Sequence, residues 1–313
     1  MSYDQAIKWA FIGFVAFLDG VLLHYCNLQL QWHDLIMPAG CAALLTVLSV
    51  RYHIRGGEPL VLCMVSLLQL GAFTTVIAVF IYAVTAVAMP LNDHWLRAMD
   101  AALGYSPPRL VQWMRAHPAL DRWSTWAYLI IVPQTLVMVL AIAFSAKRQR
   151  LERFVWQFML ATFICGLFAL VLPAYGPLHG QGIVPARWQQ PYLDHVFALR
   201  SGERFIFSWK ETEGLVTFPS FHTSWAIFLI VVWREQSVWL FVPMSILNVA
   251  IVLSTLTTGE HYLLDVFGGT LLAAGCVYAS HRINAFAYAA DGTPRVVSWI
   301  PTTLPGGSRQ WVR

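Results

Sequence analysis

Two short polar stretches near the carboxyl end of the chain carry side chains suited to acid–base or nucleophilic chemistry. In the second stretch, His261 and Asp265 are four residues apart, so on a helix they share one face. Asp265 can then accept a hydrogen bond from one ring nitrogen of His261 and leave the other nitrogen free as a base or nucleophile. Asp265 also lies about one turn inside an apolar run, where an unpaired carboxylate is costly, so its position indicates function.

The first stretch, Pro219-Ser220-Phe221-His222, has the pattern of a helix start. Proline suits the first turn of a helix because its missing N–H would be unpaired there anyway. Ser220 and His222 then fall in the first turn, where free backbone N–H groups and the positive end of the helix dipole favour an anion. Together the two stretches predict an anion site flanked by two histidines.

The composition of the whole chain fits a membrane and not a water-soluble globule. Hydrophobic residues make up 58% of the 313 residues and charged residues 12%, against roughly 25% charged residues in a typical soluble domain. We therefore predict an all-α integral membrane protein that forms one helical bundle. The formal charge of +4 lies in short loops and indicates topology, so no nucleic-acid partner is expected.

A membrane-spanning helix needs about 20 apolar residues, and eight stretches of the chain approach that length. Two of these helices are expected in 1–58 and six in 59–283, with outer loops 91–123 and 174–218, and a loose tail in 284–313. The eight predicted spans are 8–26, 34–50, 60–90, 124–145, 154–173, 219–235, 237–256 and 262–281.

Basic residues in the short connections predict how the chain crosses the membrane. With eight spans, four basic groups fall on one side, which the positive-inside rule makes cytoplasmic, with both termini inside. The stretches that carry His222 and His261 then both begin inward-running helices, so we expect them at the outer face and at one depth. The four groups are Arg51 with Arg55, the cluster in 147–153, Arg234 and Arg282.

The outer segment 91–123 carries four arginines and so departs from this charge distribution. Trp95, Leu96, Met99 and Leu103 recur at helical spacing, which predicts an amphipathic helix lying in the membrane interface. The other long outer segment, 174–218, is polar and rich in aromatic residues. A connection of that length in a compact protein is usually functional or disordered.

The residues alone leave other functions open. Two histidines and an aspartate could bind zinc, but no further ligand with a recognisable spacing is present, so neither a metal nor a cofactor is expected. A transporter or a non-catalytic membrane scaffold is a further alternative, because transporters also carry acidic residues inside the membrane.

The two stretches resemble the second and third signature motifs of the type 2 phosphatidic acid phosphatase superfamily. The second motif of that family is Pro-Ser-Gly-His, and Pro219, Ser220 and His222 match it. The third is Ser-Arg, five residues, His, three residues, Asp. Ser254, His261 and Asp265 match it at the same spacing. The resemblance covers roughly residues 90–282. It implies that the six helices of 59–283 form the catalytic core and that the two helices of 1–58 are an addition. Trp95 to Gly104 is also similar to a segment of bacterial members.

Three departures from the family pattern point to one branch of it. Phe221 replaces the glycine of the second motif, Thr255 replaces the arginine of the third, and 174–218 lacks the Lys-x6-Arg-Pro first motif. The inositol phosphorylceramide synthase branch is similar in all three respects. The resemblance therefore favours a lipid head-group phosphotransferase, with a lipid phosphate phosphatase as the close alternative.

The resemblance implies a role for each matching residue. His261 would attack phosphorus to form a phosphohistidine, Asp265 would orient His261, and His222 would protonate the leaving oxygen and then activate the acceptor. Ser220 and Thr255 would contribute to phosphate binding. The charge of the missing arginines could come from basic residues of the outer loop, although these could also be ordinary surface charges: Arg187, Arg200, Arg204 and Lys210.

The expected substrate is a membrane lipid phosphate or phosphodiester, and the acceptor is either water or a lipid hydroxyl. A vanadate haloperoxidase shares the fold family but needs a strongly basic anion pocket, which Thr255 and the missing first motif argue against. The expected location is a bacterial inner membrane, with the active site facing the periplasm or exterior. The sequence makes no prediction about the oligomeric state.

Overall fold

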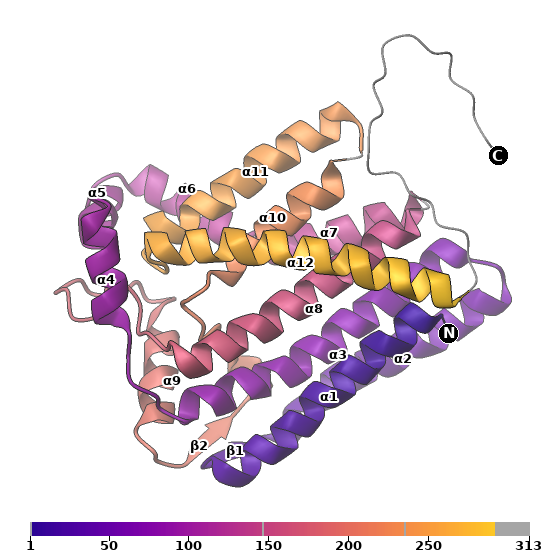
Figure 1. Cartoon of the computed structure of the whole chain (residues 1–313), viewed down its shortest axis with the longest axis horizontal. Helices are drawn as coiled ribbons and strands as arrows, with labels where there is room; N and C mark the ends of the chain where they lie inside the picture. Colours follow the sequence, from indigo (N-terminus) through magenta and orange to yellow (C-terminus); the bar gives the residue numbers. More distant parts are fainter. Residues whose placement is uncertain (1, 146, 235, 292–313) are drawn as a thin grey trace.

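The computed structural model describes residues 2–145, 147–234 and 236–291, and this part of the chain is an all-α membrane protein (Figure 1). Two three-residue strands, β1 (Leu28–Leu30) and β2 (Phe205–Phe207), pair in parallel beside the helices. Short 3-10 helices, η1 (Trp32–Leu35) and η2 (Trp209–Glu211), follow the two strands. The α-helices are α1 (Tyr3–Tyr25), α2 (Ile36–Ile54), α3 (Glu58–Ala86), α4 (Asp93–Ala102), α5 (Pro107–Arg115), α6 (Pro118–Leu129), α7 (Ile131–Phe144), α8 (Arg148–Val171), α9 (Gln190–Arg200), α10 (Phe221–Trp233), α11 (Val238–Thr257) and α12 (Leu263–Ala290).

All eight predicted spans are helical, but they are not eight equivalent helices. Within the described residues, six helices are long and apolar enough to cross a membrane, and α6 with α7 form a seventh candidate that is bent by 45°. The bend follows Leu129 because Pro133 has no N–H to donate to the carbonyl of Leu129. The eighth, α10, is an apolar helix of only 13 residues.

Two further helices can be compared with the sequence-based predictions: α4 agrees with its prediction, and α12 is longer than predicted. Helix α4 confirms the amphipathic helix predicted around Trp95, since Leu96 is buried and Trp95 is 47% exposed. Helix α12 continues to Ala290, beyond the predicted end of the core at residue 283, because its last turn is rich in alanine, the best helix former. The rest of the predicted tail, from residue 292, lies outside the described residues.

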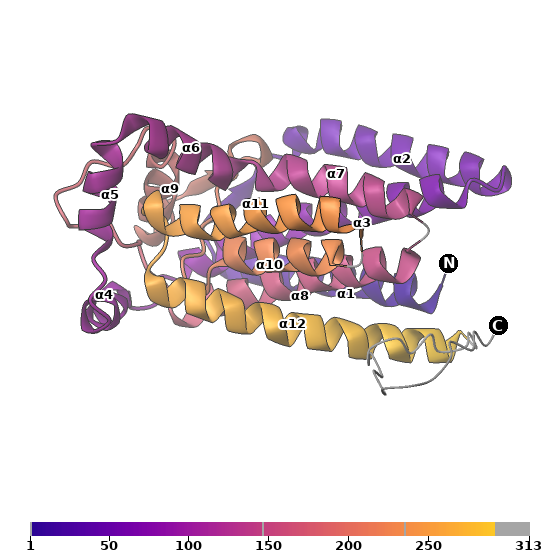
Figure 2. The ribbon, with the colours of Figure 1, turned by 90° about the horizontal axis from the view of Figure 1, so that it is seen from above.

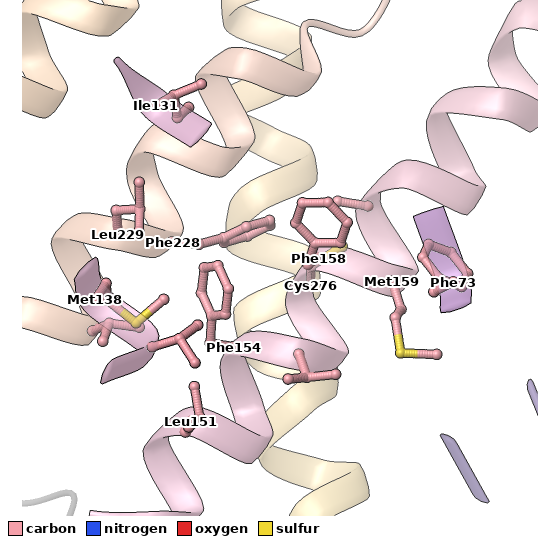
Figure 3. Packing of buried hydrophobic residues seen from close by; sticks show 14 of the residues in the cluster. Phe73, Ile131, Met138, Leu151, Phe154, Phe158, Met159, Phe228, Leu229 and Cys276 are labelled. Atoms are coloured by element: carbon pink, nitrogen blue, oxygen red, sulfur yellow. The ribbon is translucent and has the colours of Figure 1, made fainter. Parts of the chain in front are cut away.

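The bundle is built around α8, which packs against α3, α10 and α12. Phe154 and Phe158 of α8 lie beside Phe228 of α10, and Met138 of α7 closes the same cluster (Figure 3). These side chains are at most 8% exposed, so the centre of the bundle is closely packed apolar material. Seen from above, α12 runs along one edge of the bundle and α2 along the opposite edge (Figure 2).

The two ends of the bundle differ in character. The end that carries the start of α1 also carries the connections from α7 to α8 and from α10 to α11, where the predicted inner basic groups occur. The opposite end carries α4, α5, α9, the strand pair and the starts of α10 and α12 (Figure 1). Both histidine stretches are therefore at the same end of the molecule.

Helices α10 and α12 approach closely where the two stretches begin. A Cβ atom at Gly269 of α12 would lie 2.4 Å from the backbone oxygen of Ser220, so only glycine fits at this position. The Ser224 hydroxyl also donates to the Gly269 carbonyl at 2.7 Å. This contact fixes the start of α10 against the first turns of α12.

We predict that Gly269→Ala destabilises the protein by about 1–3 kcal/mol, the usual cost of overpacking, and separates the two helix starts. Gly275→Ala is the matched control, because its Cβ would meet no atom within 4 Å and alanine favours helix. Thermal unfolding of the two variants in the same detergent measures the difference. Equal melting temperatures for both variants would contradict the proposed close contact.

Candidate active site

His261 and Asp265 form a buried pair at the start of α12. The Nδ1 atom of His261 lies 3.2 Å from Oδ2 of Asp265, and the backbone N–H of Tyr262 donates to the same oxygen at 2.8 Å. Asp265 is completely buried and His261 is 4% exposed. Because Nδ1 faces the carboxylate, Nε2 is the nitrogen left to react. The predicted contact between the two side chains is present, but the prediction that both lie on one helix is wrong, because α12 begins at Leu263 and His261 precedes its N-cap, Tyr262.

His222 faces this pair from the first turn of α10. The ring centroids of His222 and His261 are 6.5 Å apart, a separation that one phosphoryl group can bridge. Tyr128 of α6 stacks on His222 with centroids 4.1 Å apart and places its hydroxyl 3.3 Å from His222 Nδ1. The Tyr128 contact occupies Nδ1 of His222 and leaves Nε2 as the nitrogen available for chemistry, and it was not anticipated from the sequence.

Ser220 is the N-cap of α10 and ties that helix to α12. Its hydroxyl oxygen accepts from the backbone N–H of Thr223 at 3.3 Å and from the Thr223 hydroxyl at 3.1 Å. Its own N–H donates to the backbone carbonyl of Asp265 at 3.0 Å. Ser220 therefore joins the two catalytic helices directly, and its hydroxyl proton is still free to be donated.

The comparison with protein families agrees with this geometry. A family model described as the PAP2 superfamily matches residues 94–279. The chain belongs to the PAP2 superfamily. Members of this superfamily are phosphatases or phosphotransferases, and the match includes both histidine stretches. No match was found among the curated proteins or among the solved structures.

Thr255 occupies the position of the arginine in the third family motif. Its hydroxyl and its backbone carbonyl both form hydrogen bonds within the protein. Its hydroxyl donates to the Val252 carbonyl at 2.7 Å within α11, and its backbone carbonyl accepts from the His261 N–H at 3.1 Å. Thr255 is fully buried. It therefore positions the backbone of His261, while its hydroxyl hydrogen is directed to its own helix.

The four basic residues predicted to bind phosphate are spread over the outer end of the bundle. Arg200 donates to the Met89 carbonyl at 2.7 Å, Arg204 bonds the side chain of Gln29, and Lys210 pairs with Asp34 at 2.9 Å. Arg187 is exposed and has no hydrogen-bond partner in the described part of the chain. It directly precedes Trp188, whose ring centroid is 5.6 Å from that of Tyr128, the residue that stacks on His222.

A second polar pair, Gln189 and Glu260, lies directly beside His261 and was also missed. The Gln189 amide donates to the Thr258 carbonyl at 3.0 Å and to a carboxylate oxygen of Glu260, and it accepts from Ala186 at 2.8 Å. Burial raises the pKa of Glu260 above its usual value. The hydrogen bond from Gln189 and the charge of His261 oppose this effect but are smaller. The pair is about 70 residues apart in the sequence, so no local pattern could reveal it.

Two buried acids of α4 hold the start of α12. Asp100 accepts from the backbone N–H groups of Leu263 and Leu264 at 3.1 and 3.3 Å, and burial raises its pKa against these two bonds. Asp93 accepts from the Tyr262 hydroxyl at 3.0 Å. These bonds occupy the first amides of α12, so α10 and not α12 offers free amides to an anion.

Metal ligation finds no additional support in the geometry. Among the residues that the structure describes, no three His, Cys, Asp or Glu side chains are grouped closely enough to hold a metal ion.

We predict that Asp265→Asn lowers kcat by roughly 10²–10⁴-fold, the usual range for a disturbed general acid–base group. The amide keeps the volume of the carboxylate but no longer fixes the tautomer of His261, so KM should change little. Hydrolysis of a nitrophenyl phosphate by purified protein measures both constants. Asp194→Asn, which alters a surface acid bonded to Gln190 at 2.8 Å, is the control and should match the wild type. An Asp265→Asn variant with more than half of the wild-type kcat would contradict the assigned role.

Proposed function

We propose that this PAP2 protein is a membrane lipid phosphoryl-transfer enzyme that works through a phosphohistidine on His261. Two contacts carry the proposal. Asp265 orients His261, and the ring centroids of His261 and His222 are 6.5 Å apart. Both side chains project at one end of an apolar helical bundle. A head group held at the membrane surface can reach that end without leaving the bilayer, which favours a lipid substrate.

The proposed reaction has two displacement steps. In the first, Nε2 of His261 attacks phosphorus, the bond from phosphorus to the leaving oxygen breaks, and His222 donates a proton to that oxygen. In the second, His222 takes a proton from the acceptor hydroxyl, the acceptor oxygen bonds to phosphorus, and the bond from phosphorus to nitrogen breaks. Asp265 stabilises the positive charge that the His261 ring carries while it is bonded to phosphorus, between the two steps.

Phosphate charge at this site would be balanced mainly by donors on and near α10. The backbone N–H groups of Phe221 and His222 have no partner in the described part of the chain, and they lie at the positive end of the helix. The Ser220 hydroxyl can add a further bond. Arg187, which is exposed and unpaired, is the best placed of the outer basic residues to supply a full positive charge.

The choice of acceptor follows from the motif departures. Phe221 and Thr255 occupy the positions that distinguish the inositol phosphorylceramide synthase branch, so we favour transfer to a lipid hydroxyl over hydrolysis. The basic groups at the opposite end of the bundle support an orientation with the site on the outer face. In a bacterial inner membrane that face borders the periplasm.

Trapping of the covalent intermediate distinguishes the roles of the two histidines. With a nitrophenyl phosphate, whose leaving group needs little protonation, His222→Ala should still form phosphohistidine and accumulate it, because acceptor activation is lost. His261→Ala should form none and should lose turnover. The measurement is acid-labile, base-stable phosphate on the quenched protein.

His53→Ala, at an exposed histidine of α2, serves as the control and should behave as wild type. Label on His261→Ala but not on His222→Ala would exchange the two roles. Absence of label from both variants and from rapidly quenched wild type, with wild-type turnover intact, would reject the covalent route in favour of direct attack by the acceptor. Substrate uptake into vesicles without any phosphoryl transfer would instead indicate a transporter.

A further inference from the structure

A pocket that is lined by neither His222 nor His261 lies at the end of the bundle that carries α4 and α5. It has a volume of about 340 Å³ and lies between α4 and the start of α5, with the 177–181 turn as its third wall. Its polar lining consists of Arg97, Tyr105, Ser106, Arg109 and Gln181. None of the described residues that line it is acidic, so two guanidinium groups face one cavity without a carboxylate.

The donors of this pocket are incompletely satisfied by the protein. Arg97 gives one N–H of its Nη2 atom to the His179 carbonyl at 3.2 Å, but its Nε is enclosed without a partner in the described part of the chain. The Tyr105 hydroxyl is likewise enclosed and unpaired, and Arg109 is exposed with no bond to a described side chain. Enclosed polar groups normally have partners, and guanidinium groups together with a phenol suit the oxygens of a phosphate.

The surroundings of the pocket place it at the level of lipid head groups. On α4, Met99 is 38% and Leu103 is 56% exposed, and the following helices expose Trp113, Trp123 and Trp126 by 51–66%. Exposed aromatic residues of this kind gather at the membrane–water interface. Helices α4 and α5, which wall the pocket, lie at the same end of the bundle as the starts of α10 and α12 (Figures 1 and 2), so the phosphate most available to the pocket belongs to a lipid.

We propose that this pocket binds the phosphate of an anionic lipid head group, as a site separate from the catalytic one. Its wall is connected to the nucleophile, because the Tyr105 N–H donates to the backbone carbonyl of Asp100 at 2.9 Å and the Asp100 side chain caps α12. Burial together with the charges of Asp100 and Asp265 raises the pKa of Tyr105, so its hydroxyl remains a donor. The proposal concerns binding alone and does not require the phosphohistidine chemistry.

The experiment compares variants of the full protein in nanodiscs of phosphatidylcholine that contain increasing fractions of phosphatidylglycerol. The wild type should gain thermal stability and retain phosphatidylglycerol in native mass spectrometry. Arg97→Gln and Arg109→Gln should each retain it roughly ten-fold more weakly, the effect of losing one charge-assisted bond. Arg97→Lys should keep part of the binding, because the charge remains but the planar fork is lost.

Arg115→Gln is the matched control, since Arg115 is an exposed arginine of α5 that does not line the pocket, and it should bind lipid as the wild type does. Arg109 is itself exposed, so Arg109→Gln tests the pocket even if Arg97→Gln fails to fold. Equal retention of phosphatidylglycerol by wild type and Arg109→Gln would overturn the proposal. An equal, arginine-dependent stabilisation by inorganic phosphate in pure phosphatidylcholine discs would overturn the assignment to a lipid and indicate a site for soluble phosphate.

Discussion

The contact between the starts of α10 and α12 is the constraint on which the catalytic geometry depends. Ser220 donates its N–H to the backbone carbonyl of Asp265, while the carboxylate of the same residue holds His261. Asp265 therefore fixes both His261 and the helix that carries His222. Gly269 permits this arrangement because no side chain stands between the two backbones.

Negative charge is concentrated around the start of α12, which affects how a phosphate can bind. Asp93, Asp100, Glu260 and Asp265 all lie in or against this turn, and three of them are buried. Most of these carboxylates accept backbone or side-chain hydrogen bonds, so their charge stabilises the turn itself. A substrate phosphate must therefore approach from the α10 side, where free amides and the Ser220 hydroxyl are available.

Local sequence patterns predicted the parts of the fold and of the site that depend on short spacing. His261 and Asp265 are four residues apart across the start of α12, with His261 just before the helix, and Pro219 with Ser220 mark the start of α10, so both local relations could be read from the sequence. The bend after Leu129 was also encoded locally, by Pro133, although the apolar run alone indicated a single straight span. The strands were missed because two three-residue segments 177 positions apart carry no pattern of their own until they pair.

The unpredicted parts of the site all arise from contacts between distant segments. Tyr128 stacks on His222 across 94 residues, and Asp100 caps α12 across 163. Arg204 and Lys210 appeared suited to phosphate, but the pairing of β1 with β2 brings them beside Gln29 and Asp34. Their partners could be recognised only after the amino-terminal segment had been placed against the outer loop.

A structure with bound orthovanadate would test most directly whether the two histidines act on one phosphoryl group. Vanadate adopts the five-coordinate geometry of phosphorus during an in-line displacement. We expect vanadium to bond Nε2 of His261, with an apical oxygen within hydrogen-bond distance of His222 and equatorial oxygens facing the amides of Phe221 and His222. Vanadate bonded to His222 instead, or bound only in the pocket lined by Arg97 and Arg109, would contradict the assignment of His261 as the nucleophile.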